Sequence, residues 1–351
     1  MGSFDAGRRG DVDVHLEDET IVSNEPIAVI GAGSWGTALA MVLSRTGRKV
    51  RLVTRTEEEA EKLNEERQNK LYLPDIPFPE SLWSGADYDW ALHQVVAVVV
   101  AVPCSSLVDV LPRLSSSKVP VICASKGIDP MGLKRTDEMM AEHIDLDRIL
   151  LLSGPSFALE VARGQPTAIT MASSDIRLAE KTATLFDDTN FRIYTNDDLV
   201  GVALGGALKN VIAIAAGVAE GLRLGHNSVS AAVTRGLAEM ARLSCACGGR
   251  HETLMGLSGL GDLVLTCTGS LSRNRRLGML LAEGMTPKEA QLSIQQAVEG
   301  VRTAEAVDRL ALSLGIEVPL MQAVARVLRG ELDIRDAVTE LMSRPERREF
   351  E

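Results

Sequence analysis

The stretch PIAVIGAGSWG at residues 26–36 decides the fold, because a short β-branched run leads directly into a glycine-rich turn. Residues 37–43 favour a helix that ends near Gly47, and residues 49–53 favour a second strand. A strand, a helix and a strand in this order predict a βαβ unit. Such a unit implies a parallel sheet with helices on its faces.

The glycines in this stretch, Gly31, Gly33 and Gly36, form the pattern G-x-G-x-x-G between the strand and the helix. The first glycine permits a tight turn, the second lets the backbone approach a pyrophosphate, and the third allows close packing of helix on strand. The N-terminus of the helix then faces the anion. In this context the pattern predicts a dinucleotide-binding site, with a purely structural turn as the alternative.

The end of the second strand bears on the choice of dinucleotide. An acidic residue there normally binds the ribose 2′-OH of NAD, but this chain has Arg55 between two threonines. Because arginine pairs with a 2′-phosphate, we expect NADP(H) to be accepted and preferred, unless Arg55 is only a solvated surface residue. Residues 57–59 are glutamates that favour capping the next helix, so the sequence does not exclude NAD(H).

Further apolar runs extend the predicted sheet. Residues 95–102 and 119–124 are typical of strands buried on both faces, and residues 150–152 and 167–171 add two candidates. Lys126 follows one of these strands beside a glycine, at the edge where open α/β sheets bind ligands. We therefore expect its ammonium group to point into a cleft.

The predicted fold class is α/β, with an N-terminal doubly wound, Rossmann-type dinucleotide-binding domain followed by a mostly α-helical C-terminal domain. We place the first domain at residues 25–199 and the second, which carries substrate and catalytic groups, at residues 200–344. Residues 1–24 are expected to form a disordered acidic arm and residues 345–351 a tail.

Composition limits the function. The 351 residues suffice for two domains, and 45% hydrophobic with 24% charged residues is typical of a soluble protein. A net charge of -11 argues against a nucleic-acid or membrane-surface partner, so local cations must hold an anionic substrate. Five scattered cysteines without metal-site spacing and the lack of a signal peptide predict a reduced, cytoplasmic protein without a metal.

The segment VGVALGGALKNVIAIAAGVA at residues 200–219 is apolar or glycine except at Lys209 and Asn210. A membrane span is one interpretation, but a central lysine is costly in lipid and no basic flank sets an orientation. We expect a buried helix instead, and no membrane span. Burial lowers the pKa of a lysine, which suits Lys209 to chemistry.

A second polar cluster suits a phosphate. Ser272 and Asn274 adjoin Arg273 and two further arginines where a helix is expected to begin, in an otherwise acidic protein. Arginine gives bidentate, charge-assisted bonds, and the helix dipole adds to them. A solvated basic loop is the alternative. Ser156 also precedes a predicted helix start, which makes it either an ordinary cap or a contact to a polar substrate atom.

With these residues in view, the chain resembles the bacterial-type NAD(P)-dependent glycerol-3-phosphate dehydrogenases from about residue 27 to beyond residue 299. The matching motifs occur in the family's order: GAGSWGTALA, ASKGI, SGPSFALEVARGQPTA, LGGALKNVIAIAAG, AAVTRGLAEMARL, GLGDLVLTCTGSLSRNRRLG and VEG. The resemblance implies reversible reduction of dihydroxyacetone phosphate to sn-glycerol 3-phosphate, which feeds phospholipid synthesis. It implies a small-molecule phosphate substrate and leaves a homodimer open.

The resemblance also implies roles for individual residues. Lys209 matches the catalytic proton carrier, and Lys126 and Asp262 are expected to orient it and the substrate. Arg55 keeps the family's basic site only in part, because threonines flank it, so the cofactor preference stays open. The remaining matches are cofactor contacts at Gly31, Gly33, Ser34, Trp35, Gly36, Arg55, Lys126, Ala158, Arg273 and Glu299, and substrate contacts at Lys126, Gly154, Ser156, Lys209, Asp262, Ser272, Arg273 and Asn274.

Two other functions compete with this one. A non-catalytic dinucleotide sensor would lack an acid–base or phosphate-binding group, whereas every expected position is filled. A related two-domain dehydrogenase for 3-hydroxy acids or UDP-sugars would share the glycine turn but lack the LGGALKN and SRNRR motifs.

Overall fold

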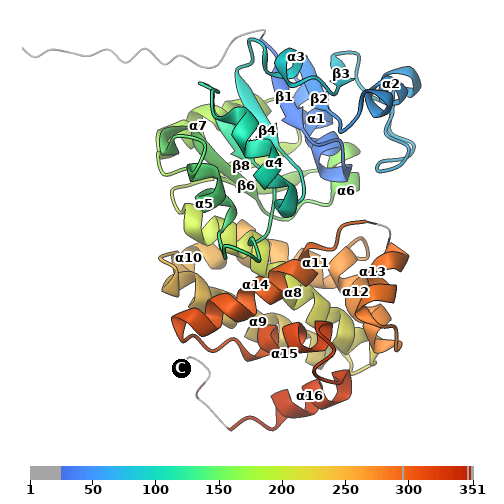
Figure 1. The fold of residues 1–351 in the computed structure, drawn as a ribbon, viewed down its shortest axis with the longest axis vertical. Helices are drawn as coiled ribbons and strands as arrows, with labels where there is room; N and C mark the ends of the chain where they lie inside the picture. Colours follow the sequence, from blue (N-terminus) through green and yellow to red (C-terminus); the bar gives the residue numbers. More distant parts are fainter. Residues whose placement is uncertain (1–24, 295, 346–347, 349–351) are drawn as a thin grey trace, which may run out of the picture.

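A computed structural model describes residues 25–294, 296–345 and 348. It places a unit built on one twisted sheet above a unit made of helices, joined by the long helix α8 (Leu199–Gly221), as Figure 1 shows. The predicted arm at residues 1–24 and most of the predicted tail lie outside the described residues. The domain limits at residues 25, 199 and 344 stay predictions; the last strand ends at Asn196 and α8 begins at Leu199.

The sheet has eight strands in the order β3-β2-β1-β4-β5-β6-β7-β8. All six strands predicted from the sequence are present, whereas β3 and β8 were missed because their apolar runs are short and they form the two edges. The strands are β1 (Ile27–Ile30), β2 (Val50–Val53), β3 (Leu82–Gly85), β4 (Ala97–Val100), β5 (Val121–Cys123), β6 (Ile149–Ser153), β7 (Thr167–Ala172) and β8 (Phe191–Asn196).

The predicted parallel sheet is confirmed except between β6 and β7, which run antiparallel. The connection between them holds only the five-residue helix α6 (Ala158–Ala162). Such a helix rises about 7.5 Å, which is less than the roughly 16 Å of a five-residue strand. The connection does not cross back along the sheet, so β7 begins at the edge where β6 ends.

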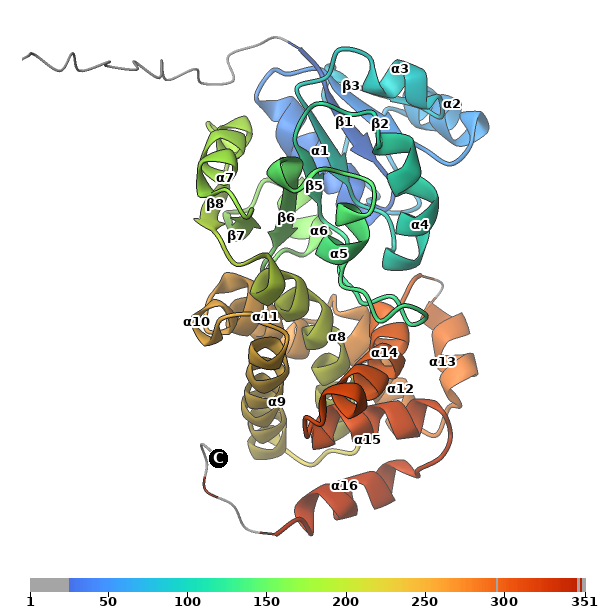
Figure 2. The same ribbon diagram turned by 60° about the vertical axis from the view of Figure 1, so that its left-hand side comes forward.

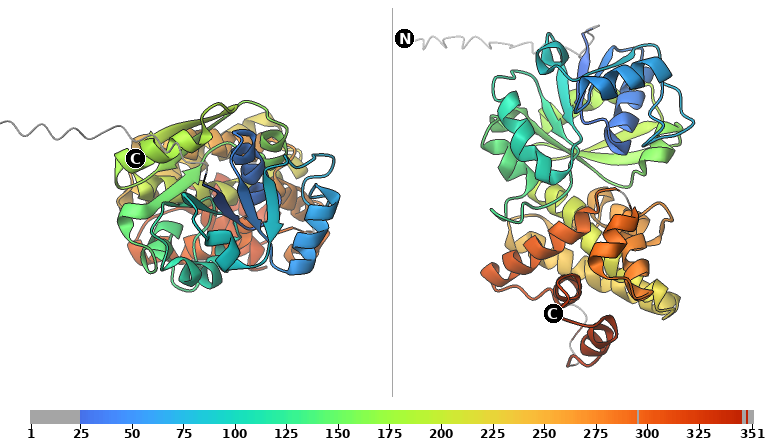
Figure 3. Two further views of the ribbon diagram at one scale, coloured as in Figure 1. Left: turned by 90° about the horizontal axis from the view of Figure 1, so that it is seen from above. Right: turned by 45° about the vertical axis from the view of Figure 1, so that its right-hand side comes forward.

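Helices cover both faces of the sheet, as the view from above in Figure 3 shows. The residues of β1 are all apolar because both faces of this strand are buried. Ile27 and Val29 belong to the core on one face, and Ala28 and Ile30 belong to the core on the other. The helices of this unit, besides α6, are α1 (Ser34–Arg45), α2 (Glu57–Glu66), α3 (Tyr88–Leu92), α4 (Leu107–Val110), α5 (Thr136–Ala141) and α7 (Ile176–Ala183).

Helix α8 connects the two units, and Figure 2 shows it running from beneath the sheet into the middle of the helical unit. Val202 and Ala203 near its start pack in a core of the sheet, and from Leu204 onward the helix lies in the core of the helical unit. The expected buried helix is confirmed. Among the described residues α8 is long and apolar enough to cross a membrane, yet 83% of its most apolar window is buried in the protein.

The other helices pack around α8. They are α9 (His226–Ala246), α10 (His251–Leu254), α11 (Asp262–Thr268), α12 (Arg273–Ala282), α13 (Pro287–Ile294), α14 (Glu299–Leu314), α15 (Pro319–Leu328) and α16 (Ile334–Met342), and η5 (Leu257–Gly261) is a single π-helical turn between α10 and α11. α12 lies directly against α8: a Cβ added at Gly217 would be 2.0 Å from the carbonyl oxygen of Arg275. The crossing therefore requires a glycine there.

This crossing leads to a stability prediction. We expect Gly217→Ala to lower the free energy of unfolding by about 1–3 kcal/mol, because separating two packed backbones outweighs the better helix propensity of alanine. Gly33→Ala is the matched control, since its Cβ has no atom within 4 Å, and should change stability by less than about 1 kcal/mol. Denaturant unfolding of both variants provides the measurement. Equal stability of both variants would show that the two helices separate freely.

Candidate active site

The glycine turn has a geometry that fits a pyrophosphate. Gly31 has φ +109°, and a Cβ there would lie 2.7 Å from the carbonyl oxygen of Ala101. A Cβ at Gly36 would lie 1.8 Å from the carbonyl oxygen of Gly31, whereas one at Gly33 would meet nothing within 4 Å. The first and third glycines therefore close the turn, and the second leaves open space beside the N-terminus of α1. Among the described residues no side chain caps that N-terminus, so its N–H groups can receive an anion.

Ser34 and Trp35, the two residues after Gly33, make different contacts. The Ser34 hydroxyl donates to the carbonyl oxygen of Tyr72 at 3.2 Å. The Trp35 indole nitrogen is buried without a hydrogen-bond partner among the described residues, and its ring lies 6.3 Å from that of Phe191. A partner is therefore still needed for that N–H.

Arg55 lies exposed just beyond β2. Its backbone N–H donates to the Glu59 carboxylate at 3.3 Å, and the Thr56 hydroxyl accepts from the Glu59 N–H at 3.2 Å. These two bonds cap the start of α2, in the glutamate run that the sequence assigned to capping. The Arg55 guanidinium makes no hydrogen bond within the described parts of the chain, so it can bind a ligand.

The centre of the site is a carboxylate between two ammonium groups. Asp262, at the start of α11, accepts from Lys209 at 2.5 Å through one oxygen and from Lys126 at 2.7 Å through the other. Lys209 also donates to the Thr266 hydroxyl at 3.0 Å, and Lys126 to the carbonyl oxygen of Gly154 at 3.2 Å. The structure thus brings together four residues that sequence reasoning placed in the site.

Local structure explains how these groups meet. Lys126 follows β5, and Lys209 comes from α8 of the other unit. A Cβ at Gly206, one turn before Lys209, would lie 2.7 Å from the Ser153 hydroxyl and 3.4 Å from the Lys126 side chain. Glycine there lets the sheet and α8 approach. Asp262 follows the π-helical turn η5, a type of irregularity that is frequent at functional sites.

The charges of this cluster are strongly coupled. Burial is the main cause that lowers the pKa of Lys209 to about 8; Asp262 opposes the shift, and Lys126 adds to it. Burial also favours the neutral form of Asp262, but the two lysines outweigh burial and hold its pKa below the usual range. Asp262 is therefore an anion near neutral pH, and Lys209 lies close to its titration point.

The second polar cluster begins α12. The Ser272 hydroxyl accepts from the Arg275 N–H at 3.2 Å, which confirms the expected helix start, and the Arg275 guanidinium donates to Glu220 at 2.7 Å. Arg273 makes no hydrogen bond within the described part of the chain. Surrounding protein atoms lower the pKa of its guanidinium, with Glu299 opposing the shift, although the side chain remains exposed to solvent.

Glu299 lies near Arg273. Burial raises the pKa of its carboxyl, with Arg273 and Arg302 opposing the shift. A Cβ at Gly127, directly after Lys126, would lie 3.6 Å from the Glu299 carboxylate. Glu299 thus borders both predicted binding segments.

Asn274 has a structural task that the sequence did not reveal. Its amide nitrogen donates to the Asn210 side-chain oxygen at 2.8 Å, and its oxygen accepts from the Gly300 N–H at 3.0 Å. These bonds tie α8, α12 and α14 together. Asn210 therefore contacts α12 rather than the Lys209 ammonium group, and Asn274 keeps one N–H for a ligand.

Sequence reasoning also missed Thr266. The signal was present, because Thr266 follows Asp262 by four residues and so shares its helix face.

Ser156 donates to the carbonyl oxygen of Gly154 at 3.0 Å and closes the turn after β6, and Ala158 is the first residue of α6. Within the described ranges no group of three or more His, Cys, Asp or Glu side chains could hold a metal ion.

A Rossmann-type sheet with an open pyrophosphate turn, completed by a buried lysine from a helical unit, defines a two-domain NAD(P)-dependent dehydrogenase. Sequence profiles for the NAD-dependent glycerol-3-phosphate dehydrogenase N-terminus and C-terminus match residues 26–179 and 198–339. The chain therefore belongs to the NAD-dependent glycerol-3-phosphate dehydrogenase family.

Individual relatives agree with the profiles. The chain is 46% identical to the glycerol-3-phosphate dehydrogenase [NAD(P)+] of Thioalkalivibrio sulfidiphilus over 94% of this chain and 100% of that protein. It is 46% identical to the enzyme of the same name from Shouchella clausii, over 93% and 98%. The crystal structure of glycerol-3-phosphate dehydrogenase from Coxiella burnetii, 43% identical, superimposes with a TM-score of 0.87 and covers 91% of this chain and 99% of that one.

Proposed function

We propose that Lys209 is the proton donor and acceptor in the family's reaction. That reaction is the reversible, NAD(P)H-dependent reduction of dihydroxyacetone phosphate to sn-glycerol 3-phosphate, and the chain is an enzyme of this type. When bound, the dinucleotide supplies the hydride. Reduction leaves negative charge on the substrate's carbonyl oxygen, and a positioned ammonium group both stabilises that charge and neutralises it with a proton.

The observation that carries this proposal is the pair of contacts from Lys209 and Lys126 to Asp262. A general acid works best when its pKa lies near the working pH, and burial lowers the pKa of Lys209 to about 8. Asp262 limits that fall and fixes the direction of the Nζ atom through a 2.5 Å bond. Lys126, also held by the Gly154 carbonyl, keeps Asp262 ionised and adds a second cation for the substrate's hydroxyl groups.

The ligands divide between the two units. The turn at Gly31, Gly33 and Gly36 is proposed to receive the pyrophosphate, because it leaves space only at Gly33. The remaining proposed cofactor contacts are Ser34, Trp35, Arg55, Lys126, Ala158, Arg273 and Glu299. Arg55 favours NADP(H) by its charge, and NAD(H) is also proposed as a cofactor.

The phosphate group of the substrate is assigned to the start of α12. Arg273 has an uncommitted guanidinium there, Ser272 caps the helix, and Asn274 retains one N–H. Gly154 and Ser156 are proposed to contact the rest of the substrate from the turn after β6. We propose that the product is used as a precursor of glycerophospholipids and that the protein acts in the cytoplasm. A homodimer is the proposed assembly.

Replacing the proton carrier tests the mechanism. Lys209→Met keeps the length of the side chain and removes the ammonium group, so we expect kcat to fall by roughly 10²–10⁴-fold. Lys288→Met, which makes the same change at an exposed position of α13, should leave kcat unchanged. Steady-state kinetics in both directions give the answer. Near-normal turnover of a folded Lys209→Met variant would remove Lys209 from the mechanism.

The pH dependence of the wild-type enzyme should have opposite signs in the two directions. Reduction needs protonated Lys209, so kcat/KM for dihydroxyacetone phosphate should fall as pH rises through about 8. Oxidation needs the neutral amine, so kcat/KM for glycerol 3-phosphate should rise over the same range. If kcat/KM changed in the same direction with pH for both substrates, Lys209 would not be the acid in reduction and the base in oxidation.

Arg273→Gln tests the phosphate site. Loss of a charge-assisted contact should raise KM for dihydroxyacetone phosphate by roughly 10- to 150-fold. Dihydroxyacetone, which lacks the phosphate, should be reduced with an unchanged kcat/KM. Arg276→Gln, an exposed position of the same helix, is the control. Equal losses with both substrates would show that Arg273 does not bind the phosphate.

A further inference from the structure

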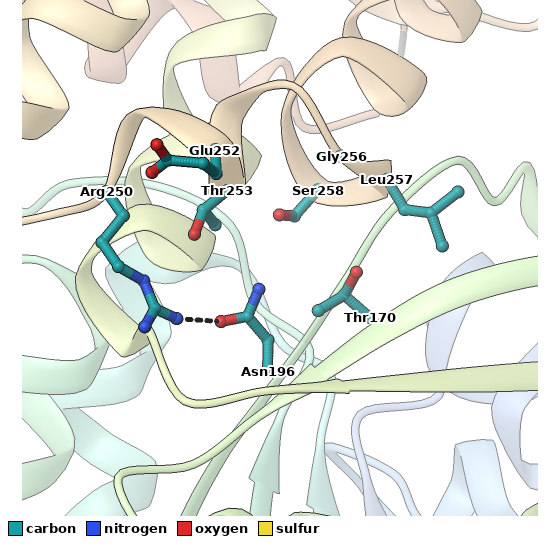
Figure 4. A pocket seen from close by; sticks show the side chains of 8 residues that line it. All are labelled: Thr170, Asn196, Arg250, Glu252, Thr253, Gly256, Leu257 and Ser258. Atoms are coloured by element: carbon teal, nitrogen blue, oxygen red, sulfur yellow. Dashed lines mark hydrogen bonds between the residues drawn. The ribbon is translucent and has the colours of Figure 1, made fainter.

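A pocket of about 430 Å³ lies where the sheet meets the helical unit, away from the glycine turn (Figure 4). Thr170 of β7 and Asn196 of β8 line it from the sheet, and Thr253 of α10 and Ser258 of η5 line it from the other unit. β7 is three strands from β4 in the sheet order, which corresponds to roughly 14 Å. The pocket is therefore separate from the glycine turn of the predicted cofactor site.

Three hydroxyl groups in this pocket lack partners. Thr170, Thr253 and Ser258 are 6%, 5% and 1% exposed, and none of their hydroxyls has a hydrogen bond within the described parts of the chain. Figure 4 shows all three pointing toward the same space. By contrast, the hydroxyls of Thr266 and Thr268 bond to carbonyl oxygens one helical turn back. The three pocket hydroxyls make no such bond within the described residues, so they are open to hydrogen bonding by a ligand in the pocket.

Asn196 and Arg250 complete the polar lining. The Asn196 side-chain oxygen accepts from Arg250 at 3.0 Å, which leaves the Asn196 amide nitrogen facing the hydroxyls in Figure 4. The lining thus offers hydroxyls that donate or accept and an amide that donates. Such a set matches a ligand rich in hydroxyl groups.

The charges around the pocket exclude an anionic ligand. Arg250 forms an ion pair with Asp197, and Asp198 lies 3.9 Å away. Glu252 adds another carboxylate among the lining residues, so carboxylates outnumber the one guanidinium group near the pocket. An anion entering this partly buried pocket would meet net repulsion. A neutral ligand is not repelled in this way.

We propose that this pocket binds a small, uncharged polyol. The ligand would bridge the sheet, through Thr170 and Asn196, to the helical unit, through Thr253 and Ser258. It would also lie next to the catalytic cluster, because Ser258 belongs to the turn that leads into Asp262. Thr170 pairs in register with Ser153, the residue before the Gly154 carbonyl that holds Lys126.

Xylitol is a suitable probe for the full-length protein, with binding followed by saturation-transfer NMR. We expect a saturable signal in the wild type and about tenfold weaker binding in the double variant Thr253→Val, Ser258→Ala, which removes two hydrogen-bonding groups. Thr234→Val, which removes an exposed hydroxyl of α9, is the matched control and should bind like the wild type. Because the removed hydroxyls have no partner in the part of the chain that the structure describes, the double variant should unfold at the wild-type temperature.

Several outcomes would overturn the proposal. These are a xylitol signal that does not saturate, one that saturates equally in the wild type and the double variant, or saturable binding of inorganic phosphate that the double variant loses. If the double variant is unfolded, Ser258→Ala alone gives the same comparison. The readout needs no turnover, so it is independent of the role of Lys209.

Discussion

The bidentate engagement of Asp262 by Lys126 and Lys209 is the interaction on which the rest of the site depends. One lysine comes from the end of a strand and the other from the long helix of the second unit, so the carboxylate also joins the two units. Removing one partner of a buried charged group leaves an uncompensated charge, which is costly. The cluster therefore fixes both the proton carrier and the contact between the units.

The packing around this cluster brings the sheet and α8 close together, which lets the two lysines reach Asp262. Gly206 lets α8 approach Lys126, and α8 passes from the core of the sheet into the core of the helical unit. The apolar length of α8, which resembles a membrane span by composition alone, desolvates Lys209 and lowers its pKa. Asn210, the next residue, instead holds α12 in place through Asn274. Two adjacent polar residues of one apolar helix thus have different tasks.

Much of the fold could be predicted because its signals are local. The glycine pattern, the β-branched runs and the change to alanine- and leucine-rich segments follow from neighbouring residues. The antiparallel β7 could not be predicted, since it depends on whether the connection through α6 crosses the sheet. The contacts of Asp262 with Lys126 and Lys209 join residues 136 and 53 positions apart, and only the family resemblance suggested them. The unpartnered hydroxyls at the domain junction left no sequence signal, because serine and threonine are ordinary helix and strand residues.

The pH dependence of glycerol 3-phosphate oxidation by Asp262→Asn tests the central claim most directly. Without the carboxylate, two neighbouring ammonium groups repel, so the midpoint for Lys209 should move below the wild-type value of about 8 by at least about one pH unit. Thr266→Val, which removes only a neutral hydrogen bond to Lys209, should move it less. An unchanged or higher midpoint in folded Asp262→Asn would contradict the account.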